Sequence, residues 1–442
     1  MQTYLEDSRK IPVRDTYDVI VCGGGAAGFV AAAAAARHGA KTLLIEKYGF
    51  LGGTGTAGLM VQFGSIFDGS EVLVGGYTHE FLHRLVAENY ADFYSEQSHS
   101  LIFDPEGMIA ICQKMVLESG AQLLLHSLVT GVIQDGGRLK GVIVENKSGR
   151  SACLAKVIID ATGDGDIAAR AGAAFDCGNE EGLLQPVSLE FLLGNVDATK
   201  VSGDSVGEVI AYIQKAKEDG TWKIPSDQFF SWGRVKKCGA PDIPESAFFF
   251  INASNAPGIN GASAEDLTTA EVECRKQVPL LLEFLQKYVP GFEKCYLDRT
   301  AAQVGIRETR RIRGKYTLTR QDILEARHFY DGIVPGCNSI DVHHVKGKVF
   351  GHEFLAKGTH YQIPWRCFLP EKGEGLIVTG RCLSADHYAL GSVRVMVVCM
   401  PMGEACGIAA AVACKENCRL EDVPIIKVKN YLREQGTVIS DT

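Results

Sequence analysis

No CxxC pair occurs among the 14 cysteines of the sequence, and no long run of lysine and arginine interrupts its 442 residues. The missing CxxC pairs exclude a zinc ribbon and a thioredoxin-like redox motif, and so few cysteines in so long a chain cannot form a dense disulfide framework. The formal net charge is −8 and no basic face stands out, which argues against nucleic acid as the main partner. These absences favour an ordinary globular protein.

A signal peptide and a membrane span are also missing. Residues 1–15 are polar and charged, unlike the apolar core of a signal peptide. The longest uncharged stretch near the start, Val19–Ala36, contains four glycines, so a strand, a turn and a buried helix explain it better than a span. We therefore expect no membrane association and a cytoplasmic protein.

Four cysteines late in the chain, Cys399, Cys406, Cys414 and Cys418, follow one another at spacings of 7, 8 and 4 residues. At about 100° per helical residue they fall on one face of a helix. Iron–sulfur ligands usually come from tight loops with shorter spacings, so we interpret these cysteines as small buried hydrophobic residues. The sequence predicts no metal site.

What the chain does contain is a glycine-rich turn between a strand and a helix. Residues 23–28 (GGGAAG) fit the pattern GxGxxG. The apolar run Tyr17–Cys22 before them predicts a buried strand, and the alanine-rich run Ala26–His38 predicts a helix. A lone GxGxxG is weak, but strand, turn and helix are the context that a dinucleotide-binding turn requires.

Each glycine of this turn has a physical role. Gly23 permits the tight turn, Gly25 lets the backbone approach a pyrophosphate, and Gly28 lets helix and strand pack closely. The next predicted strand, Lys41–Glu46, ends in a carboxylate 18 residues after Gly28, where it can accept hydrogen bonds from both ribose hydroxyls. The alternative is a packing turn followed by a surface glutamate; the register of all parts favours the dinucleotide site.

Further glycine-containing turns favour FAD over NAD. Gly52–Gly58 (GGTGTAG) directly follows the βαβ unit, Ala161–Gly163 follows the predicted strand Lys156–Asp160, and Thr379–Arg381 ends a late apolar run. A second glycine-rich loop can pass close to the ribityl chain and the ring of a flavin, whereas a nicotinamide dehydrogenase does not need one. We therefore expect FAD as the cofactor.

The length of the chain exceeds what one hydrophobic core usually supports, so we expect two domains. The two ends share short buried strands and helices, while the middle is more polar, with aromatic clusters and one clear helix. The predicted fold is α/β: a discontinuous Rossmann-type FAD-binding domain, residues 15–172 and 364–442, with an inserted α+β substrate or cap domain, residues 173–363. Near the end, residues 392–414 predict one long helix, bent or broken near Pro401.

A family resemblance rests on five segments: YDVIVCGGGAAG, EKYGFLGGTGTAG, IIDATGDGDIAARAG, GIRETRRIRG, and YQIPWRCFLP through GRCLSADHYALGSVRVMVVCMPMGEACG. From about Tyr17 to about Ala413 the chain resembles the FAD-dependent oxidoreductases of the glutathione-reductase/fumarate-reductase superfamily. It is most similar to the bacterial family related to the flavin subunit of heterodisulfide reductase. The middle of the chain matches less tightly.

The resemblance implies the following places along FAD: the pyrophosphate at Gly23, Gly25, Ala26, Ala27 and Gly28; the ribose at Glu46; the flavin side at Lys47, Gly53 and Thr54; the adenine at the Val129 backbone; the adenosine half under Ala161, Thr162 and Gly163; the ribityl–phosphate region at Gly380 and Arg381. Gly391, Ser392 and Val393 would start the last helix and aim its N-terminus at the pyrimidine edge of the flavin. A helix N-terminus there would stabilise the negative charge of reduced flavin.

The sequence departs from its relatives in two ways. Members with covalently bound flavin use a histidine in the second glycine-rich loop, and GGTGTAG has none, so we expect non-covalent FAD. The disulfide reductases carry a CxxxxC pair near the first helix and a second nucleotide-binding domain. Both are absent here, which puts NADPH-driven disulfide reduction in doubt.

Candidate catalytic residues lie in the inserted region. Arg307, in the arginine-rich segment 305–314, could anchor a carboxylate or donate a proton, or it could belong to an ion-pair network with Glu308 that holds the domains together. His343 and His360 could move protons, although any single histidine is more often structural. His343 and His344 are neighbours and so face opposite sides of a strand, which makes no metal site.

The leading hypothesis is hydride or electron transfer between a small organic substrate, carboxylate or polyol-like, and non-covalent FAD. One alternative is a flavoprotein subunit that passes electrons to a redox partner protein. Another is a non-redox protein in which FAD is structural or sensory. The sequence identifies neither the substrate nor the electron acceptor.

Overall fold

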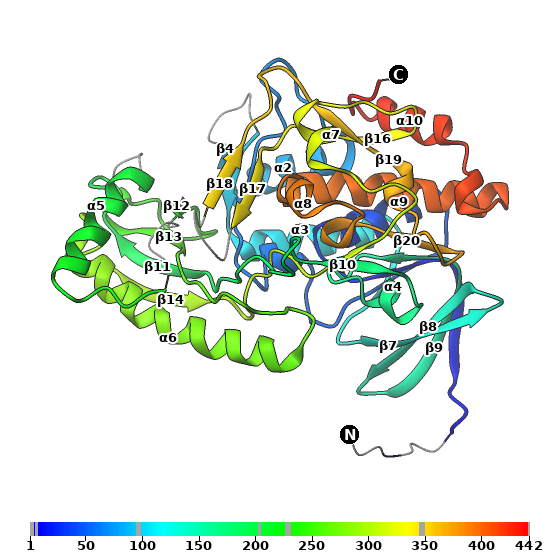
Figure 1. Ribbon diagram of the computed structural model, residues 1–442, viewed down its shortest axis with the longest axis horizontal. Helices are drawn as coiled ribbons and strands as arrows, with labels where there is room; N and C mark the ends of the chain where they lie inside the picture. Colours follow the sequence, from blue (N-terminus) through cyan, green and yellow to red (C-terminus); the bar gives the residue numbers. More distant parts are fainter. Residues whose placement is uncertain are drawn as a thin grey trace.

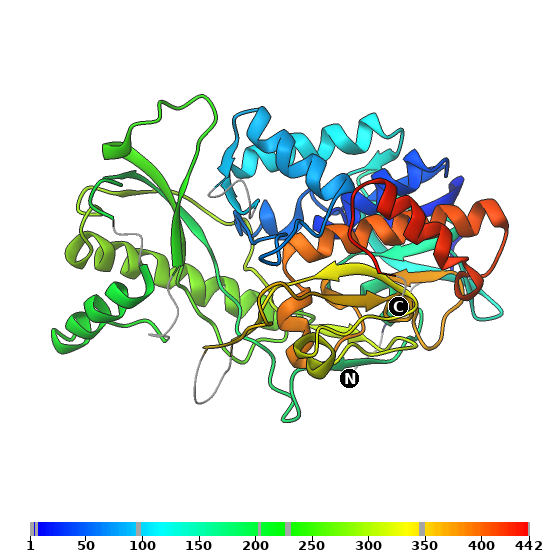
Figure 2. The same cartoon turned by 90° about the horizontal axis from the view of Figure 1, so that it is seen from above.

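The computed structural model describes residue 4 and residues 8–93, 99–201, 205–225, 231–343 and 350–440. The chain is a mixed α/β protein, with a seven-stranded sheet and its helices on one side and a smaller antiparallel sheet with two helices standing apart on the other (Figure 1). The view from above separates the two parts, with the smaller sheet in green (Figure 2). The α/β fold class predicted from the sequence is confirmed.

The sheet begins with the expected βαβ unit. β1 (Val13–Cys22) leads through the glycine turn into α1 (Ala26–Arg37), and β2 (Thr42–Ile45) returns beside β1 in parallel. The strand order is β6-β2-β1-β9-β8-β7, and β20 pairs with β9. The short runs ending in glycine or in a carboxylate therefore converge at the carboxyl ends of neighbouring parallel strands, the edge at which α/β sheets bind ligands.

Alternate residues of β1 enter two different hydrophobic cores, as the two-residue repeat of a strand requires. Val19 and Val21 belong to the larger core, which includes the buried face of α1. Ile20 and Cys22 belong to a second core on the opposite face, with Val129 among its members. Because both faces are covered, the strand reads as a continuous apolar run.

The remaining strands of this sheet are β6 (Gln122–Leu124), β7 (Leu128–Asp135), β8 (Arg138–Asn146), β9 (Gly149–Asp160) and β20 (Leu376–Val378). β7, β8 and the first part of β9 form an antiparallel meander, and Gly136 and Gly137 turn between β7 and β8 at positive φ, as the Asp-Gly-Gly sequence predicts. The end of β9 pairs in parallel with β1 and β20.

The C-terminal part of the chain interlocks with its beginning. α9 (Met396–Glu416) crosses α1 so closely that a Cβ at Gly403 would lie 2.0 Å from Ala27 O. A Cβ at Gly407 would lie 2.3 Å from the carbonyl oxygen of Ala31. The two glycines remove the side chains that would otherwise keep the helix backbones apart.

The prediction of one helix over residues 392–414 is wrong. The structure has two helices, α8 (His387–Val393) and α9, separated at Arg394 and Val395. Pro401 lies inside α9. Gly391, Ser392 and Val393 therefore end α8 and do not start the last long helix, which begins at Met396.

The smaller sheet is antiparallel, in the order β12-β13-β11-β14. Its strands are β11 (Phe191–Val196), β12 (Ser231–Val235), β13 (Ala247–Asn252) and β14 (Tyr296–Thr300), and its helices are α5 (Ser205–Glu218) and α6 (Ala264–Tyr288). The aromatic run in β13 supplies Phe249 and Phe250 to the core.

Two ribbons follow the smaller sheet, and the first of them, β16 with β19, lies against α9. Their strands are β16 (Gly332–Gly336), β17 (Ile340–His343), β18 (Phe350–Glu353) and β19 (Tyr361–Pro364). The division of the chain at residues 172 and 364 stays a prediction. His344 lies outside the described residues.

The other elements are β3 (Gln62–Phe63), α2 (Gly76–Ala87), β4 (Ala91–Phe93), β5 (Leu101–Phe103), α3 (Pro105–Glu118), α4 (Asp166–Arg170), β10 (Phe175–Cys177), β15 (Arg310–Ile312), α7 (Arg320–Leu324) and α10 (Ile425–Glu434). Within the described ranges one helix, α9, is long and apolar enough to cross a membrane, but 94% of its most apolar window is buried inside the protein. Such burial is typical of a core helix. All 14 cysteines are described and none forms a disulfide; burial raises the pKa of the Cys399 thiol to about 12.

Candidate functional site

The glycine turn after β1 leaves the start of α1 open. Gly23 has φ +97°, a conformation that favours glycine, and a Cβ at Gly28 would lie 1.8 Å from Gly23 O. Gly25 is the N-cap of α1, and no side chain caps the helix or adds an acid to its first turn. The N–H groups and the positive end of the dipole at Ala26 and Ala27 therefore present an anion-binding surface.

The second glycine-rich loop packs on this turn backbone to backbone. Gly25 and Gly52 form a parallel bridge, and the N–H of Gly52 donates to Gly24 O over 2.9 Å. A Cβ at Gly53 would lie 2.7 Å from the Cα of Gly25. Gly53 thus lies beside the dinucleotide turn, while Thr54 next to it is exposed. The expected place of both residues along the flavin stays a prediction.

Glu46 is buried at the end of β2 and its carboxylate is held toward the turn. Oε2 accepts a hydrogen bond from Gly24 N–H over 2.6 Å, and Oε1 accepts one from Tyr48 N–H over 2.9 Å. The two bonds fix the carboxylate beside the glycine turn, and its role as a ribose ligand stays a prediction. Lys47 points differently: it is exposed, and its Nζ lies 5.0 Å from the centre of the Tyr48 ring.

The turn after β9 is organised by a carboxylate that the sequence reasoning missed. Asp160 is fully buried and accepts from Thr162 N–H and Oγ1–H and from the N–H groups of Ile167 and Ala168 at the start of α4. Burial is the main reason that its pKa lies above its ordinary value. Ala161 follows directly, and a Cβ at Gly23 would lie 2.5 Å from its carbonyl oxygen. The Ala161–Gly163 turn therefore meets the glycine turn; its predicted place over the adenosine half of FAD stays a prediction.

Arg381 belongs to a polar cluster beside this turn. Its guanidinium donates to Asp164 Oδ1 over 2.8 Å and to Thr309 Oγ1 over 3.1 Å, and Thr309 Oγ1–H also donates to Asp164 over 2.8 Å. A Cβ at Gly163 would lie 3.1 Å from a nitrogen of Arg381, and one at Gly380 would lie 3.2 Å from the Cβ of Ala27. The predicted residues at 380 and 381 thus lie between the first turn of α1 and the turn after β9.

Val129 and the end of α8 complete the predicted set. Val129 is buried in β7 opposite Val144. Ser392 is fully buried: its Oγ lies 2.7 Å from the Tyr361 hydroxyl and donates to Asn338 O over 2.5 Å. Val393 is also fully buried, and a Cβ at Gly391 would lie 2.7 Å from the backbone oxygen of Asp341 in β17. These contacts give the three residues of α8 a packing role.

Arg307 is half-buried beside a second arginine. It donates to Pro186 O over 2.8 Å and to Ser188 Oγ over 2.9 Å. Burial, and then repulsion by Arg394, lower its pKa to about 10. Nothing in the spacing of Arg307 and Arg394 along the sequence indicates that the two guanidinium groups approach one another.

Arg394 and His343 share one carboxylate. Arg394 donates to Gln185 Oε1 over 2.9 Å and lies 3.4 Å from Asp341 Oδ2, while His343 Nε2 lies 3.3 Å from Asp341 Oδ1. The partners of Asp341, led by His343 and Arg394, overcome burial and hold its pKa far below its usual range. Burial and the Arg307 charge lower the pKa of His343 to about 3, so this imidazole is neutral at pH 7.

Two further carboxylates line the same region. Glu190 is buried, its Oε2 has no hydrogen-bond partner among the described residues, and burial raises its pKa well above the ordinary value. Glu308 is ion-paired with Arg311, and its Oε2 lies 2.9 Å from His387 Nδ1. The ion-pair network expected around Glu308 therefore exists, built on Arg311 and not on Arg307. We refer to Arg307, Arg394, Asp341, His343 and Glu190 as the arginine cluster.

The chain segments that carry the two arginines both contact the second glycine-rich loop. The N–H of Gln303, four residues before Arg307, donates to Ala57 O over 3.1 Å. On the other side, a Cβ at Gly55 would lie 3.1 Å from the sulfur of Met396, two residues after Arg394. The loop that is expected to run along the flavin thus touches both chain segments that supply the arginines.

His360 lies elsewhere. Its Nδ1 is 3.4 Å from Asp68 Oδ2, its ring stacks on His328 at 4.9 Å, and Nε2 is buried with no hydrogen-bond partner among the described residues. No contact found in the described part of the chain links it with Arg307 or His343. The structure therefore brings two of the three predicted catalytic residues together and leaves the third apart.

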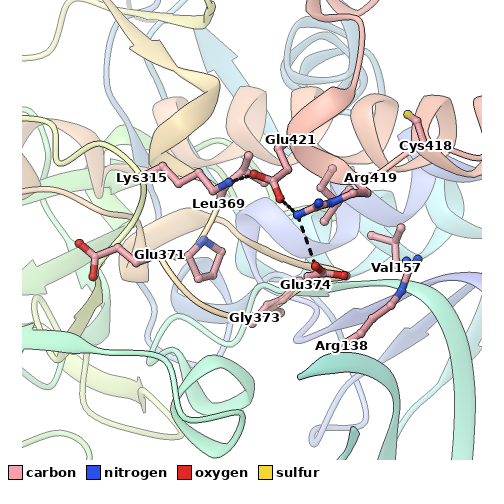
Figure 3. Close-up of a pocket in the computed structure, with 14 residues that line it drawn as sticks. Arg138, Val157, Lys315, Leu369, Glu371, Gly373, Glu374, Cys418, Arg419 and Glu421 are labelled. Atoms are coloured by element: carbon pink, nitrogen blue, oxygen red, sulfur yellow. Dashed lines mark hydrogen bonds and ion pairs between the residues drawn. The ribbon is translucent and has the colours of Figure 1, made fainter. Parts of the chain in front are cut away.

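A cavity of about 210 Å³ opens away from both sites. It is lined by Arg138 of β8, Val157 of β9, the segment before β20 and residues 418–421 after α9. Figure 3 shows its charged lining: Arg419 lies 3.3 Å from Glu374 and is paired with Glu421, which is also paired with Lys315. Because these charges are matched with one another and no predicted cofactor residue lines the cavity, it is not the dinucleotide site.

The residues present fit FAD. A Cβ at Gly25 would contact only Gly53 Cα, at 3.8 Å, among described atoms, so the glycine leaves open space at the uncapped start of α1. A phosphate suits that position. The carboxylate of Glu46 follows β2, at the same edge of the sheet as the turn after β9, and suits the hydroxyl groups of a ribose. When bound, FAD supplies hydride and electron transfer.

The match to a protein-family model agrees with this reading. No curated protein matches the sequence significantly. Among solved structures, a geranylgeranyl bacteriochlorophyll reductase-like protein from Thermoplasma acidophilum is similar at 16% identity and a TM-score of 0.48, over 95% of this chain and 84% of that one. A p-nitrophenol 4-monooxygenase from Pseudomonas putida is similar at 11% identity and a TM-score of 0.48, over the same shares. The family model described as FAD dependent oxidoreductase matches residues 18–432. The chain belongs to that family: it is an FAD-dependent oxidoreductase.

Proposed function

We propose that the enzyme transfers hydride between a small organic substrate that carries a carboxylate and non-covalently bound FAD, with the arginine cluster as the substrate site. One observation carries the proposal: Arg307 and Arg394, far apart in sequence, converge on segments that both touch the second glycine-rich loop. The cluster is therefore adjacent to the loop along which the flavin is expected to lie. Non-covalent binding is supported by the absence of histidine from residues 52–58.

The arginines suit an anionic ligand. The two half-buried guanidinium groups repel one another, which, after burial, is the second reason that the pKa of Arg307 is lowered to about 10. A carboxylate bound between them would relieve this repulsion and accept charge-assisted hydrogen bonds. Arginine is suited to this role because its planar donors match the two oxygens of a carboxylate.

His343 is the proposed proton-transfer group, and its basicity depends on the ligand. Burial and Arg307 lower its pKa to about 3, so without an anion it is a weak base. A substrate carboxylate that neutralises the arginines would remove their part of this lowering and raise the pKa, while burial would still hold it below the ordinary value. Asp341, ionised beside Nε2, orients the imidazole. His343 would thus be a stronger base with substrate bound than without it.

A binding experiment tests the carboxylate. The holoenzyme is titrated with small monocarboxylates, dicarboxylates and polyols while the flavin absorbance is followed, and each compound is then tested as an electron donor under anaerobic conditions. We expect carboxylates to perturb the flavin band. Arg394→Met should weaken that binding by about 10- to 150-fold, the equivalent of one lost charged hydrogen bond of about 1.5–3 kcal/mol.

Arg313→Met is the matched control, since Arg313 is exposed on the same segment as Arg307 and pairs with Asp176 at 2.5 Å. A variant that keeps the wild-type flavin content and melting temperature is folded. If Arg394→Met does not fold, Arg394→Lys is tested in its place. Equal carboxylate binding by Arg394→Met and Arg313→Met would refute the site. If only polyols reduce the flavin, the proposed substrate class is a polyol and not a carboxylate.

The other expectations remain predictions: the relation to the flavin subunit of heterodisulfide reductase, electron transfer to a redox partner protein and a cytoplasmic location. No contact within the described residues bears on them.

A further inference from the structure

Three histidines meet on one side of α2, outside the flavin and arginine sites. His79 and His83 lie four residues apart on this helix, so their side chains share a face. His99 joins them from the segment just before β5. One ring nitrogen from each histidine can be chosen so that all three lie within 4.8 Å of one another.

The ring arrangement is compact. The centres of the His79 and His83 rings are 4.0 Å apart, and the centre of the His99 ring is 5.5 Å from each. Phe93 of β4 covers one side, with its ring centre 5.4 Å from that of His83 and 5.3 Å from that of His99. His83 is exposed, whereas His79 and His99 are half-buried, so an ion could enter from solvent at His83.

This donor set matches a known coordination chemistry. Three neutral imidazoles suit zinc and other borderline divalent ions of the first transition series. In a tetrahedral site with Zn–N bonds of about 2.0–2.1 Å, two ligand nitrogens lie roughly 3.3 Å apart. Nitrogens that are already within 4.8 Å reach that spacing by small side-chain rotations. Three protein ligands leave the fourth position to water.

We propose that His79, His83 and His99 form a binding site for one divalent transition-metal ion of the zinc type. The ion would join the middle of α2 to His99, just before β5. At its start, α2 also meets α9, where Tyr77 N–H donates to Glu404 over 3.0 Å. A metal ion here would therefore make α2, the helix that packs against α9, more rigid.

The competing explanation is a cluster of imidazoles without an ion, packed edge-on against Phe93. Measuring metal binding separates the two. Purified holoprotein is stripped with a chelator and dialysed, then titrated with ZnCl2 by calorimetry, and its metal content is measured after gel filtration. Co²⁺ is tested in parallel through its d–d absorption, read at wavelengths longer than the flavin bands. We expect one ion per chain, a tetrahedral cobalt spectrum and a higher melting temperature with zinc.

Variants locate the site. His79→Ala and His83→Gln should each abolish stoichiometric binding while flavin content stays unchanged, because the flavin residues lie elsewhere. His38→Ala is the control, since His38 contacts Ala34 O and the Tyr431 ring and has no histidine beside it among the described contacts. Binding that is absent in the wild-type protein, or equal in His79→Ala and His38→Ala, would overturn the proposal.

Discussion

Gly25 and Gly28 stand three residues apart in the same turn, yet the structure gives them different roles that one pair of alanine variants can separate. A Cβ at Gly25 would contact Gly53 Cα at an ordinary 3.8 Å, and its φ of −71° is open to any residue. A Cβ at Gly28 would lie 1.8 Å from Gly23 O. We therefore expect Gly25→Ala to fold normally and lose FAD, and Gly28→Ala to lose stability even without FAD.

The magnitudes differ accordingly. For Gly28→Ala the helix must move away from the strand, and overpacking of this kind costs about 1–3 kcal/mol. At roughly 2–4 °C per kcal/mol the melting temperature of the apoprotein should fall by about 2–12 °C. Gly25→Ala should leave that temperature unchanged or slightly higher, because alanine restricts the unfolded chain. Its methyl group displaces the pyrophosphate, and losing one charged hydrogen bond of about 1.5–3 kcal/mol weakens FAD binding by about 10- to 150-fold.

The assay uses apoprotein and holoprotein of each variant. Thermal unfolding of the apoprotein reports the packing term, and calorimetric titration of the apoprotein with FAD reports the binding term. The reasoning is refuted if Gly25→Ala binds FAD as tightly as the wild-type protein, or if the Gly28→Ala apoprotein melts at the wild-type temperature.

Three other changes test individual contacts. Gly403→Leu, at the crossing where a Cβ would already lie 2.0 Å from Ala27 O, should lower the melting temperature by several degrees and reduce flavin content; a wild-type melting curve would contradict this. Burial raises the pKa of Glu404 from 4.5 to about 8, so the folded state keeps a proton that the unfolded state releases between those values and stability falls as pH rises through that window. Glu404→Gln should flatten this decline in a pH series of melting temperatures; an unchanged slope would show that another group causes it. Ser392→Ala removes the hydrogen bond to Tyr361 and should lower the free energy of unfolding by about 1–3 kcal/mol while FAD affinity stays within about twofold; a large loss of affinity would instead place Ser392 at the flavin.

The sequence was sufficient for the parts of the fold that local patterns determine. The βαβ unit, the Asp-Gly-Gly hairpin and the carboxylate of Glu46 follow from spacing along a short stretch of chain. The break between α8 and α9 does not, since no glycine or proline stands at it. Arg394, at the break, donates hydrogen bonds to Gln185 and Asp341, and these contacts exist only in the folded protein. Local sequence patterns could not predict them.

The same limit applies to the sites. The approach of Arg307 and Arg394 depends on how the inserted region folds over α8, so sequence spacing could not predict it. The sequence could have indicated two members of the histidine cluster, because His79 and His83 show the four-residue spacing of one helix face. The third member, His99, lies 16 residues after His83, a spacing that no single helix face explains. The sequence-based expectation of no metal site stands against the proposed site until metal binding is measured.

The tight crossing of α1 and α9 has a consequence for how the protein is made. Ten of the 12 residues of α1 are buried, and α9, which packs against this helix, begins only at Met396, far along the chain. Until α9 has been synthesised, the alanine face of α1 and the glycine turn at its start lack their covering layer, and exposed apolar surface of this kind favours aggregation. The nascent chain should therefore depend on chaperones until α9 has emerged, and FAD should be loaded only after that point.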